Sequence, residues 1–419
     1  MGVVSSDTAH EGRGLALLLS TVAFIVCSAV WSIFAIIGIT IHKKLGLSNF
    51  QLASLLGLPV LSGSVARLLL GILTDRYGGR RVFAVVMFTA GVATFSLTWA
   101  ETYQQFLVAA TFVGIAGGSF AVGAAYVSRF YGQGAQGTVL GIFAAGSVIG
   151  AVLLKWEAPR VMVEYGWQTV GHVCAFAIIV MGVIFWTFSK DEPRWPEGGR
   201  KRQSPLKNIR VWRFSLYYFY AYGAFVALSL WLPKYLMVVY QVDLLTGGQI
   251  AALFSISAIF FRVVGGYLAD QYGARGLMYW TFLAGMAATF VLAFSSTKTA
   301  NGPAGFGLEV GLVPFMVTVF MLGFFMALGM AAVFKHIPTY YPSGVGAAGG
   351  LVSMFGGLGG AVLPVAFGVL VDKTELWTSC FMLLFVLATI SLISMHVSIR
   401  GMERDAASGE VNKLPGIFS

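Results

Sequence analysis

The chain has 419 residues, of which 58% are hydrophobic and 11% are charged, and its formal net charge is +10. A soluble domain carries about 25% charged residues. This composition, with a mean hydropathy of +0.81, therefore excludes an ordinary soluble protein and predicts an integral membrane protein. The positive charge requires no nucleic-acid partner, because basic cytoplasmic loops in contact with anionic lipid account for it.

Apolar stretches of membrane-spanning length recur along the whole chain and are separated by short polar breaks. Lipid offers no hydrogen-bond partners to the backbone, so each stretch is expected to be a helix, which gives an all-α integral membrane protein. In chain order, the twelve expected transmembrane helices span 14–41, 50–74, 82–99, 104–131, 136–159, 166–188, 211–239, 246–269, 276–297, 310–336, 344–371 and 376–399.

The distribution of Lys and Arg predicts that both termini lie in the cytoplasm. We expect a multi-pass protein of the cytoplasmic membrane with no cleavable signal peptide. Its expected parts are an N-terminal tail 1–13, a six-helix half 14–188, a basic cytoplasmic linker 189–210, a second six-helix half 211–399 and a C-terminal tail 400–419. The three cysteines are scattered among the apolar stretches and suggest neither a disulfide framework nor a metal site. No cofactor is expected.

The second helix of each half carries the same motif. SVARLLLGILTDRYGGRR surrounds Arg67, and AIFFRVVGGYLADQYGAR surrounds Arg262, 195 residues later. Arg67, Gly71, Asp75 and Gly78 correspond to Arg262, Gly266, Asp270 and Gly273. A weaker repeat links the glycine-rich stretches 137–153 and 346–363. Two related six-helix halves joined by a cytoplasmic loop predict an internally duplicated secondary transporter.

The GxxxD-[RQ]-xG-x-R motif, present in both halves, resembles the signature of the major facilitator superfamily. GIAGGSFAVGAAYVSRFY (114–131), AAVFKHIPTYYP (331–342) and the glycine-rich fifth and eleventh helices resemble its nitrate/nitrite porter family. The likeness extends from about residue 14 to residue 399. It implies the major facilitator fold and alternating-access transport of nitrate and nitrite. The chain is more similar to the branch associated with proton-coupled nitrate uptake.

Arg67 and Arg262 lie about eight residues from the inner helix ends, which places them near the middle of the membrane. A charge at this depth is costly unless it faces an opposite charge, water or the bundle interior. No Asp or Glu falls near the middle of an expected helix, so two cations facing one cavity predict an anion site, with structural snorkelling as the alternative. A planar guanidinium can match a planar oxyanion with forked donors, which a lysine cannot do.

The resemblance assigns further residues to the site. It implies that Arg67 and Arg262 bind the substrate, that Phe120 and Tyr222 sandwich it, and that Tyr218, Gly350 and Ser353 contact it. Ser147 stands, within a small shift, where the family pattern has an asparagine, and its hydroxyl can donate one hydrogen bond. Ordinary packing is the alternative for each aromatic residue, and close helix packing is the alternative for the glycines.

Charged residues at the inner helix ends are candidates for gating. Asp75, Arg76 and Arg80 in the first copy, and Asp270 and Arg275 in the second, could form interhelical ion pairs that hold one conformation closed. A solvated basic loop is the alternative for Arg76. Lys335 and His336, at the inner end of the tenth helix, suit either a gate or snorkelling.

Other functional classes find less support. No HExxH motif, nucleophile motif or soluble catalytic domain suggests an enzyme, and the duplicated arginines favour a carrier over a channel or receptor. The nearest alternative is an oxalate- or formate-type carboxylate exchanger. The family branch favours proton symport, whereas two permanent cations without a central carboxylate suggest nitrate/nitrite exchange. We expect a monomer whose partners are nitrate, nitrite and membrane lipid.

Overall fold

The computed structural model describes residues 6–192, 207–294, 297–299, 302–304, 310–342 and 344–407. The N-terminal half contains α1 (Ser6–Trp31), α2 (Phe34–Leu45), α3 (Asn49–Tyr77), α4 (Gly79–Leu97), α5 (Tyr103–Gly114), η1 (Ile115–Gly118), α6 (Ser119–Ser128), α7 (Gln136–Tyr165) and α8 (Trp167–Phe188). The C-terminal half contains α9 (Ile209–Tyr218), η3 (Phe219–Ala224), α10 (Phe225–Val239), α11 (Leu244–Tyr272), α12 (Ala274–Ala293), α13 (Leu312–Tyr340), α14 (Val345–Thr374) and α15 (Ser379–Ala407).

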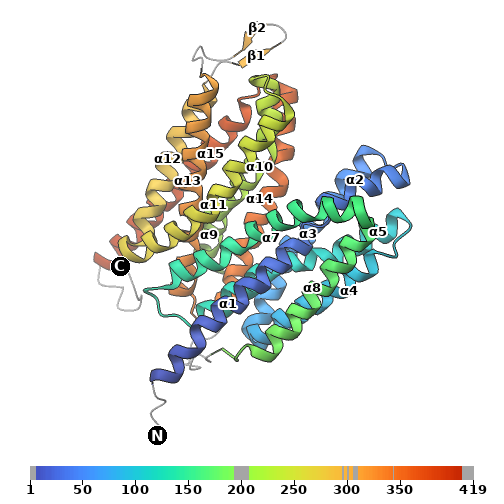
Figure 1. The fold of residues 1–419 in the computed structure, drawn as a ribbon. Coiled ribbons are helices and arrows are strands. Elements are labelled where there is room, and N and C mark those ends of the chain that lie inside the picture. Colours follow the sequence, from blue (N-terminus) through green and yellow to red (C-terminus); the bar gives the residue numbers. More distant parts are fainter. Residues whose placement is uncertain are drawn as a thin grey trace.

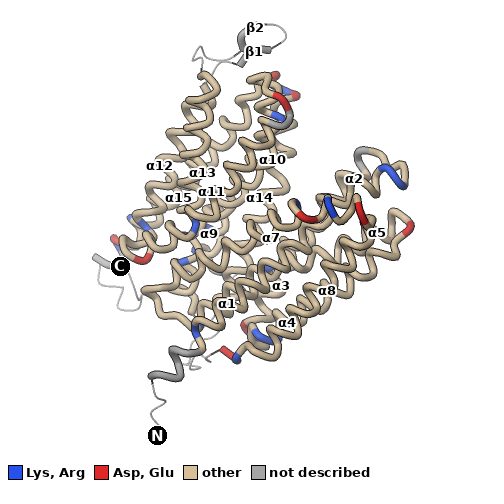
Figure 2. The backbone as a smooth tube through the Cα atoms, viewed as in Figure 1, with Lys and Arg blue, Asp and Glu red and all other residues tan. Residues whose placement is uncertain are grey.

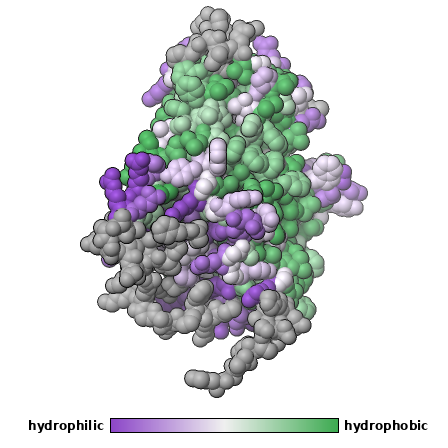
Figure 3. All heavy atoms as spheres, turned by 90° about the vertical axis from the view of Figure 1, so that its left-hand side faces the viewer, coloured by the Kyte–Doolittle hydropathy of each residue, from purple (hydrophilic) through white to green (hydrophobic). Residues whose placement is uncertain are grey.

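The structure confirms the twelve transmembrane helices: in the described part of the chain, twelve helical segments are long and apolar enough to cross a membrane. On the face seen in Figure 3, an extensive apolar surface covers the helices. The spans differ from the expected ones mainly at their ends, since α15 continues to Ala407 and the first span breaks between α1 and α2. One antiparallel hairpin, β1 (Thr297–Thr299) with β2 (Gly302–Ala304), is a small departure from an all-α fold.

The two halves lie side by side and contact each other through two long helix pairs (Figure 1). Helix α14 packs along α3, and α11 packs along α7. The start of α1 and the end of α15 lie toward one end of the molecule, and toward the opposite end the helices of the two halves spread apart (Figure 1). The halves are therefore in close contact on the side where α1 begins and α15 ends, which is called the inner side below.

Glycines permit both contacts between the halves. A Cβ added to Gly71 of α3 would collide with the carbonyl oxygen of Gly346 in α14. A Cβ added to Gly266 of α11 would collide in the same way with Gly137 of α7. These four residues are the glycines of the two sequence repeats, so the duplication recorded in the sequence is a duplication of the interface.

The end of the repeated helix is also set by glycine. Gly78 follows the last residue of α3 with φ of 89°, and Gly273 follows the last residue of α11 with φ of 84°. An L side chain is strained in this conformation, so glycine allows the chain to turn directly into the next helix. The turn holds the inner ends of α3 and α4, and of α11 and α12, next to each other.

Two spans contain irregular turns near the middle of the membrane. The fourth span passes through the 3₁₀ turn η1, and the seventh passes through the π-helical turn η3. Such turns change the direction of the side chains that follow and are often found at functional sites. Here η1 precedes Phe120, and η3 contains Tyr222 and follows Tyr218.

Candidate anion site

Arg67 and Arg262 lie in the interior of the molecule, where their side chains belong to equivalent helices of the two halves. Arg67 is 4% exposed and Arg262 is 6% exposed. Most of the other charged residues lie toward the ends of the helices, and the interior is largely uncharged (Figure 2). Both arginines are thus buried charges, and their role in binding an anion stays a prediction.

Neutral groups hold the two guanidiniums in place. The Nε of Arg67 donates to the carbonyl oxygen of Gly117 at 3.1 Å, and its Nη1 donates to the carbonyl oxygen of Ser353 at 2.8 Å. The Nη2 of Arg262 donates to the hydroxyl of Tyr218 at 2.8 Å. Among the described residues, neither arginine forms an ion pair. The protein thus orients both guanidiniums without a neutralising carboxylate from these residues.

Both arginines share the same two aromatic neighbours. The guanidinium carbon of Arg67 lies 5.8 Å from the ring centre of Phe120 and 5.6 Å from that of Tyr222. The corresponding distances from Arg262 are 5.4 Å and 5.9 Å. The four side chains therefore form a cycle in which cations and rings alternate. Each ring face attracts the neighbouring guanidiniums, and this attraction offsets part of the repulsion between the two cations.

A second layer of aromatic residues supports this cycle. Tyr218 stacks on Tyr222 with ring centres 5.2 Å apart and planes 4° apart. Phe334 of α13 meets Phe120 edge-on at 4.8 Å and Tyr218 edge-on at 4.9 Å. A Cβ on Gly356 of α14 would collide with the Tyr218 ring, so glycine makes room for the stack. Phe334, which sequence reasoning missed, thus connects the aromatic residues of both halves.

The other residues expected to contact the anion differ in how they lie relative to the two arginines. Ser353 meets Arg67 through its carbonyl oxygen, while its hydroxyl bonds to Gly350 within α14. Gly350 packs against the backbone of Arg67 and not against its guanidinium. Ser147 is half-buried and, within the described chain, makes no hydrogen bond to either arginine. It lies one helical turn from Phe143, whose ring centre is 6.0 Å from that of Phe120.

Asp75 connects the two halves at the inner side. Its carboxylate accepts hydrogen bonds from the backbone N–H of Gly346 at 3.0 Å and of Ala347 at 2.7 Å, in the first turn of α14. Arg129 pairs with Asp75 at 2.8 Å and also with Glu192, which accepts a bond from the backbone N–H of Gly79. A carboxylate is favoured at a helix N-terminus by the unsatisfied amides and the helix dipole.

Asp270 makes the equivalent connection from the C-terminal half to the N-terminal half. It accepts from the backbone N–H of Gly137 at 3.0 Å and of Thr138 at 2.7 Å, in the first turn of α7. The Thr138 hydroxyl adds a third bond at 2.8 Å, and Lys335 pairs with Asp270 at 3.2 Å. We call these two sets of contacts the Asp75 gate and the Asp270 gate.

The remaining gate candidates lie outside these direct connections between the halves. Arg80 contacts Asp191 at the start of the linker and the carbonyl oxygen of Trp186 in its own half. Arg275 bonds to the hydroxyl of Tyr340, and Arg76 lies over the ring of Tyr77. Sequence reasoning missed Arg129 and Glu192 as gate residues. Arg129 at the end of the fourth span gave a signal, as a charged residue after an apolar run, whereas nothing in the linker composition distinguishes Glu192.

The arrangement suits reversible binding of a small anion. It offers two fixed cations and two flanking aromatic rings, and some guanidinium N–H groups make no hydrogen bond to a described residue. Within the described ranges, no group of three or more His, Cys, Asp or Glu residues is placed to hold a metal ion.

Comparison with known proteins identifies the family. Residues 19–308 match the Major Facilitator Superfamily model. The "Probable nitrate/nitrite antiporter NarK1" of Thermus thermophilus is 40% identical over 403 residues, which cover 91% of each chain. The "Nitrite extrusion protein" of Bacillus subtilis (strain 168) is 27% identical, covering 90% of this chain and 92% of its own.

A solved structure shows the same fold. The structure of the major facilitator superfamily transporter FucP superposes with a TM-score of 0.69 at 15% sequence identity, covering 90% of this chain and 98% of that one. The protein is thus a membrane transporter and not an enzyme. The chain belongs to the nitrate/nitrite porter family of the major facilitator superfamily.

Proposed function

We propose that the protein transports nitrate and nitrite across the cytoplasmic membrane by alternating access, with the anion bound between Arg67 and Arg262. The observation that supports this site is the alternating cycle of two guanidiniums and two aromatic rings, in which no described carboxylate neutralises the cations. The names of the nitrate and nitrite transporters among its relatives support the choice of substrate.

The chemistry of the cycle fits a small planar oxyanion. Each guanidinium presents donors in one plane, so nitrate can accept forked hydrogen bonds from it. Phe120 and Tyr222 offer ring surfaces, which favour a weakly hydrated anion over a strongly hydrated one. Tyr218 acts through Arg262, whose orientation its hydroxyl fixes. Gly350 acts by allowing α14 to approach α3 closely, and Ser353 holds Arg67 through its backbone.

The two gates assign a conformation to the structure. Both Asp75 and Asp270 join one half to the other at the inner side, while the halves spread apart at the opposite end (Figure 1). With both termini in the cytoplasm, as the Lys and Arg distribution suggests, this is an outward-facing state. Anion binding reduces the repulsion between Arg67 and Arg262, and release of both gates then opens the site to the cytoplasm.

Proton symport remains the proposed coupling, on the basis of the family branch, and nitrate/nitrite exchange is the second candidate. Two observations favour exchange. Neither central arginine is paired with a carboxylate among the described residues, so the empty site keeps both positive charges. The Thermus thermophilus relative is also named an antiporter.

The binding site is tested by Arg67→Lys and Arg262→Lys in the purified protein. Each change keeps the charge and removes the fork, which should weaken nitrate binding by about ten- to a hundredfold. Arg160→Lys is the matched control, because Arg160 is 66% exposed and its ion pair is with a neighbouring exposed residue, Glu157. Normal nitrate affinity in both central variants would overturn the site, and stronger competition by formate or oxalate than by nitrite would favour the carboxylate exchanger.

The coupling is tested by nitrate uptake into proteoliposomes with the pH gradient and the internal anion varied independently. Symport predicts that an inward proton gradient drives accumulation into vesicles that contain no nitrite. Exchange predicts that uptake requires internal nitrite or nitrate and is insensitive to the gradient.

A further inference from the structure

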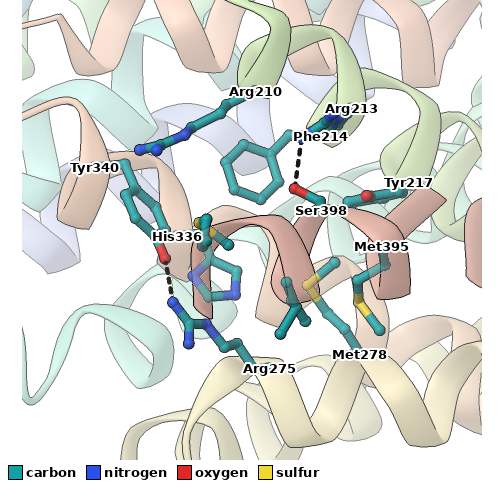
Figure 4. A pocket seen from close by; sticks show the side chains of 12 residues that line it. Arg210, Arg213, Phe214, Tyr217, Arg275, Met278, His336, Tyr340, Met395 and Ser398 are labelled. Carbon is teal, nitrogen blue, oxygen red and sulfur yellow. Dashed lines mark hydrogen bonds between the residues drawn. The ribbon is translucent and has the colours of Figure 1, made fainter. Parts of the chain in front are cut away.

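A cleft at the inner end of the C-terminal half is separate from the anion site between the halves. It has a volume of about 50 Å³ and lies among α9, α12, α13 and α15. Figure 4 shows Arg210, Arg213 and Arg275 around it, together with the rings of Phe214 and His336. All these residues belong to one half, so the cleft does not depend on contact between the halves. We call it the inner cleft.

The inner cleft is basic. Arg210, Arg213 and Arg275 are all half-buried, and none of the described residues that line the cleft is acidic. Arg213 donates to the hydroxyl of Ser398 at 2.6 Å, and Arg275 donates to that of Tyr340 at 3.0 Å. The Arg210 guanidinium lies 5.9 Å from the ring centre of Tyr340. Two hydroxyl oxygens and a ring face thus contact the three arginines of the cleft.

His336 adds a polar group with open hydrogen-bonding capacity. Its side chain is only 8% exposed, and its ring stacks on Phe214 with centres 5.5 Å apart and planes 17° apart. Among the described residues, neither ring nitrogen has a hydrogen-bond partner. The ring lines the cleft, where a bound ligand could supply that partner (Figure 4).

We infer that the inner cleft binds the phosphate group of an anionic ligand. A phosphate presents several acceptor oxygens around one centre, and clustered arginines are the side chains that recognise it best. Arg210 and Arg213 supply the charge from the first turns of α9, and His336 can donate a further hydrogen bond from the opposite wall. The inner cleft does not require the transported anion, because Arg67 and Arg262 are not among the residues that line it.

The surroundings of the inner cleft suit a phospholipid headgroup. Met278, Met395 and Ile399 contribute flexible apolar side chains to its wall. The adjacent outer surfaces of α12 and α15 are apolar, with Trp280 65% exposed and Val397 60% exposed. Basic pockets between helices on the cytoplasmic side are known to receive anionic headgroups. A lipid whose phosphate enters the cleft could therefore extend its acyl chains along these two helices, whereas a soluble phosphate would use the charges alone.

The test measures thermal unfolding of the purified full-length protein in neutral detergent. It is titrated separately with a short-chain phosphatidylglycerol, the corresponding phosphatidylcholine and inorganic phosphate. We expect phosphatidylglycerol or inorganic phosphate to raise the melting temperature. The Arg210→Gln/Arg213→Gln variant should require roughly ten- to a hundredfold more of the same ligand. Arg81→Gln is the matched control, since Arg81 is an exposed arginine at the inner end of the other half.

The separate titrations show whether the bound phosphate group belongs to a lipid or to a soluble anion. A response to phosphatidylglycerol alone assigns the site to a membrane lipid, and an equal response to inorganic phosphate assigns it to a soluble anion. The inference is overturned when the double variant and Arg81→Gln respond alike to every ligand, or when phosphatidylcholine acts as strongly as phosphatidylglycerol. The single variant Arg213→Gln provides the same comparison if the double variant fails to elute as a folded protein in size-exclusion chromatography.

Discussion

The Asp75 gate and the Asp270 gate place the same carboxylate against the same kind of helix end, yet they are supported differently. Arg129 connects Asp75 to a second carboxylate, Glu192, at the start of the linker between the halves. Lys335 pairs with Asp270 alone among the described carboxylates and also donates to the carbonyl oxygen of Ala269. The Asp75 gate is thus part of a wider charged network, whereas the Asp270 gate is local and has the additional Thr138 hydroxyl.

The repeated sequence thus specifies the aspartate and the helix end that it contacts, but not the cation that pairs with the aspartate. One reporter can test both gates. Cysteines at Gly134 and Gly276 would carry spin labels at the inner ends of the two halves, where both glycines are exposed with no neighbouring atom within 4 Å of an added Cβ. The three native cysteines are buried and should react little with the label. A longer distance between labels reports opening of the inner side.

Asp270→Asn should have the largest effect. It removes the carboxylate partner of Lys335, whose side chain is only 15% exposed, and should shift the closed-to-open equilibrium by about 3 kcal/mol, or roughly a hundredfold. Asp75→Asn should shift this equilibrium less, because Arg129 still has an ion pair with Glu192. The measurement is the fraction of labelled molecules in which the two spin labels are far apart. Equal shifts for the two variants would show that Glu192 does not compensate.

Arg129→Lys should rank next. A lysine keeps one positive charge but lacks the planar fork with which Arg129 bridges two carboxylates, so we expect the closed state to lose about 2 kcal/mol of stability. Lys335→Arg is the reciprocal change and should alter the distance distribution little, because Asp270 already has several partners. A larger effect of Lys335→Arg than of Arg129→Lys would contradict the distinction between the two gates.

Glu192→Gln should open the Asp75 gate by a smaller amount, about 1.5 kcal/mol, since the pair between Arg129 and Asp75 remains. Asp191→Asn is a close control. Asp191 is the adjacent linker residue, is 71% exposed and lies 3.6 Å from Arg80, so its pair should contribute almost nothing. The same distance measurement would refute the role of Glu192 if both variants matched the parent protein.

Thr138→Ala should have the smallest effect. It removes one hydroxyl bond to Asp270 and leaves the two backbone bonds, which should cost about 1 kcal/mol, or around fivefold in the equilibrium. The change makes the Asp270 gate resemble the Asp75 gate, where Ala347 has no hydroxyl. Spectra identical to those of the parent would mean that this bond does not contribute to closure.

The sequence contained most of the fold and the centre of the site. Runs of apolar residues predicted the twelve spans, and the repeat around Arg67 and Arg262 predicted two equivalent buried cations. These features are local or periodic, so they can be read without knowing how the helices pack. The functional role assigned to the arginines and rings is still a prediction.

The rest of the site depends on how distant helices meet. Phe334 contacts Phe120 and Tyr218 only because α13 approaches both halves. The acceptors of Arg67 are carbonyl oxygens of Gly117 and Ser353, and a backbone group has no signature in the amino-acid sequence. Sequence reasoning could choose a serine side chain for this purpose, but it could not foresee that Ser353 would contribute its main chain.

Both gates have a side chain on one side and main-chain amides on the other. Asp75 meets the N–H groups of Gly346 and Ala347, and Asp270 meets those of Gly137 and Thr138. Every amino acid except proline retains that N–H. At Ala347 and Thr138 most substitutions therefore keep the donor, whereas at Gly346 and Gly137 any side chain would collide with the facing helix. A saturation mutagenesis screen would record steric intolerance at these glycines and loss of the carboxylate at the aspartates. It would not reveal that main-chain N–H groups make the contact.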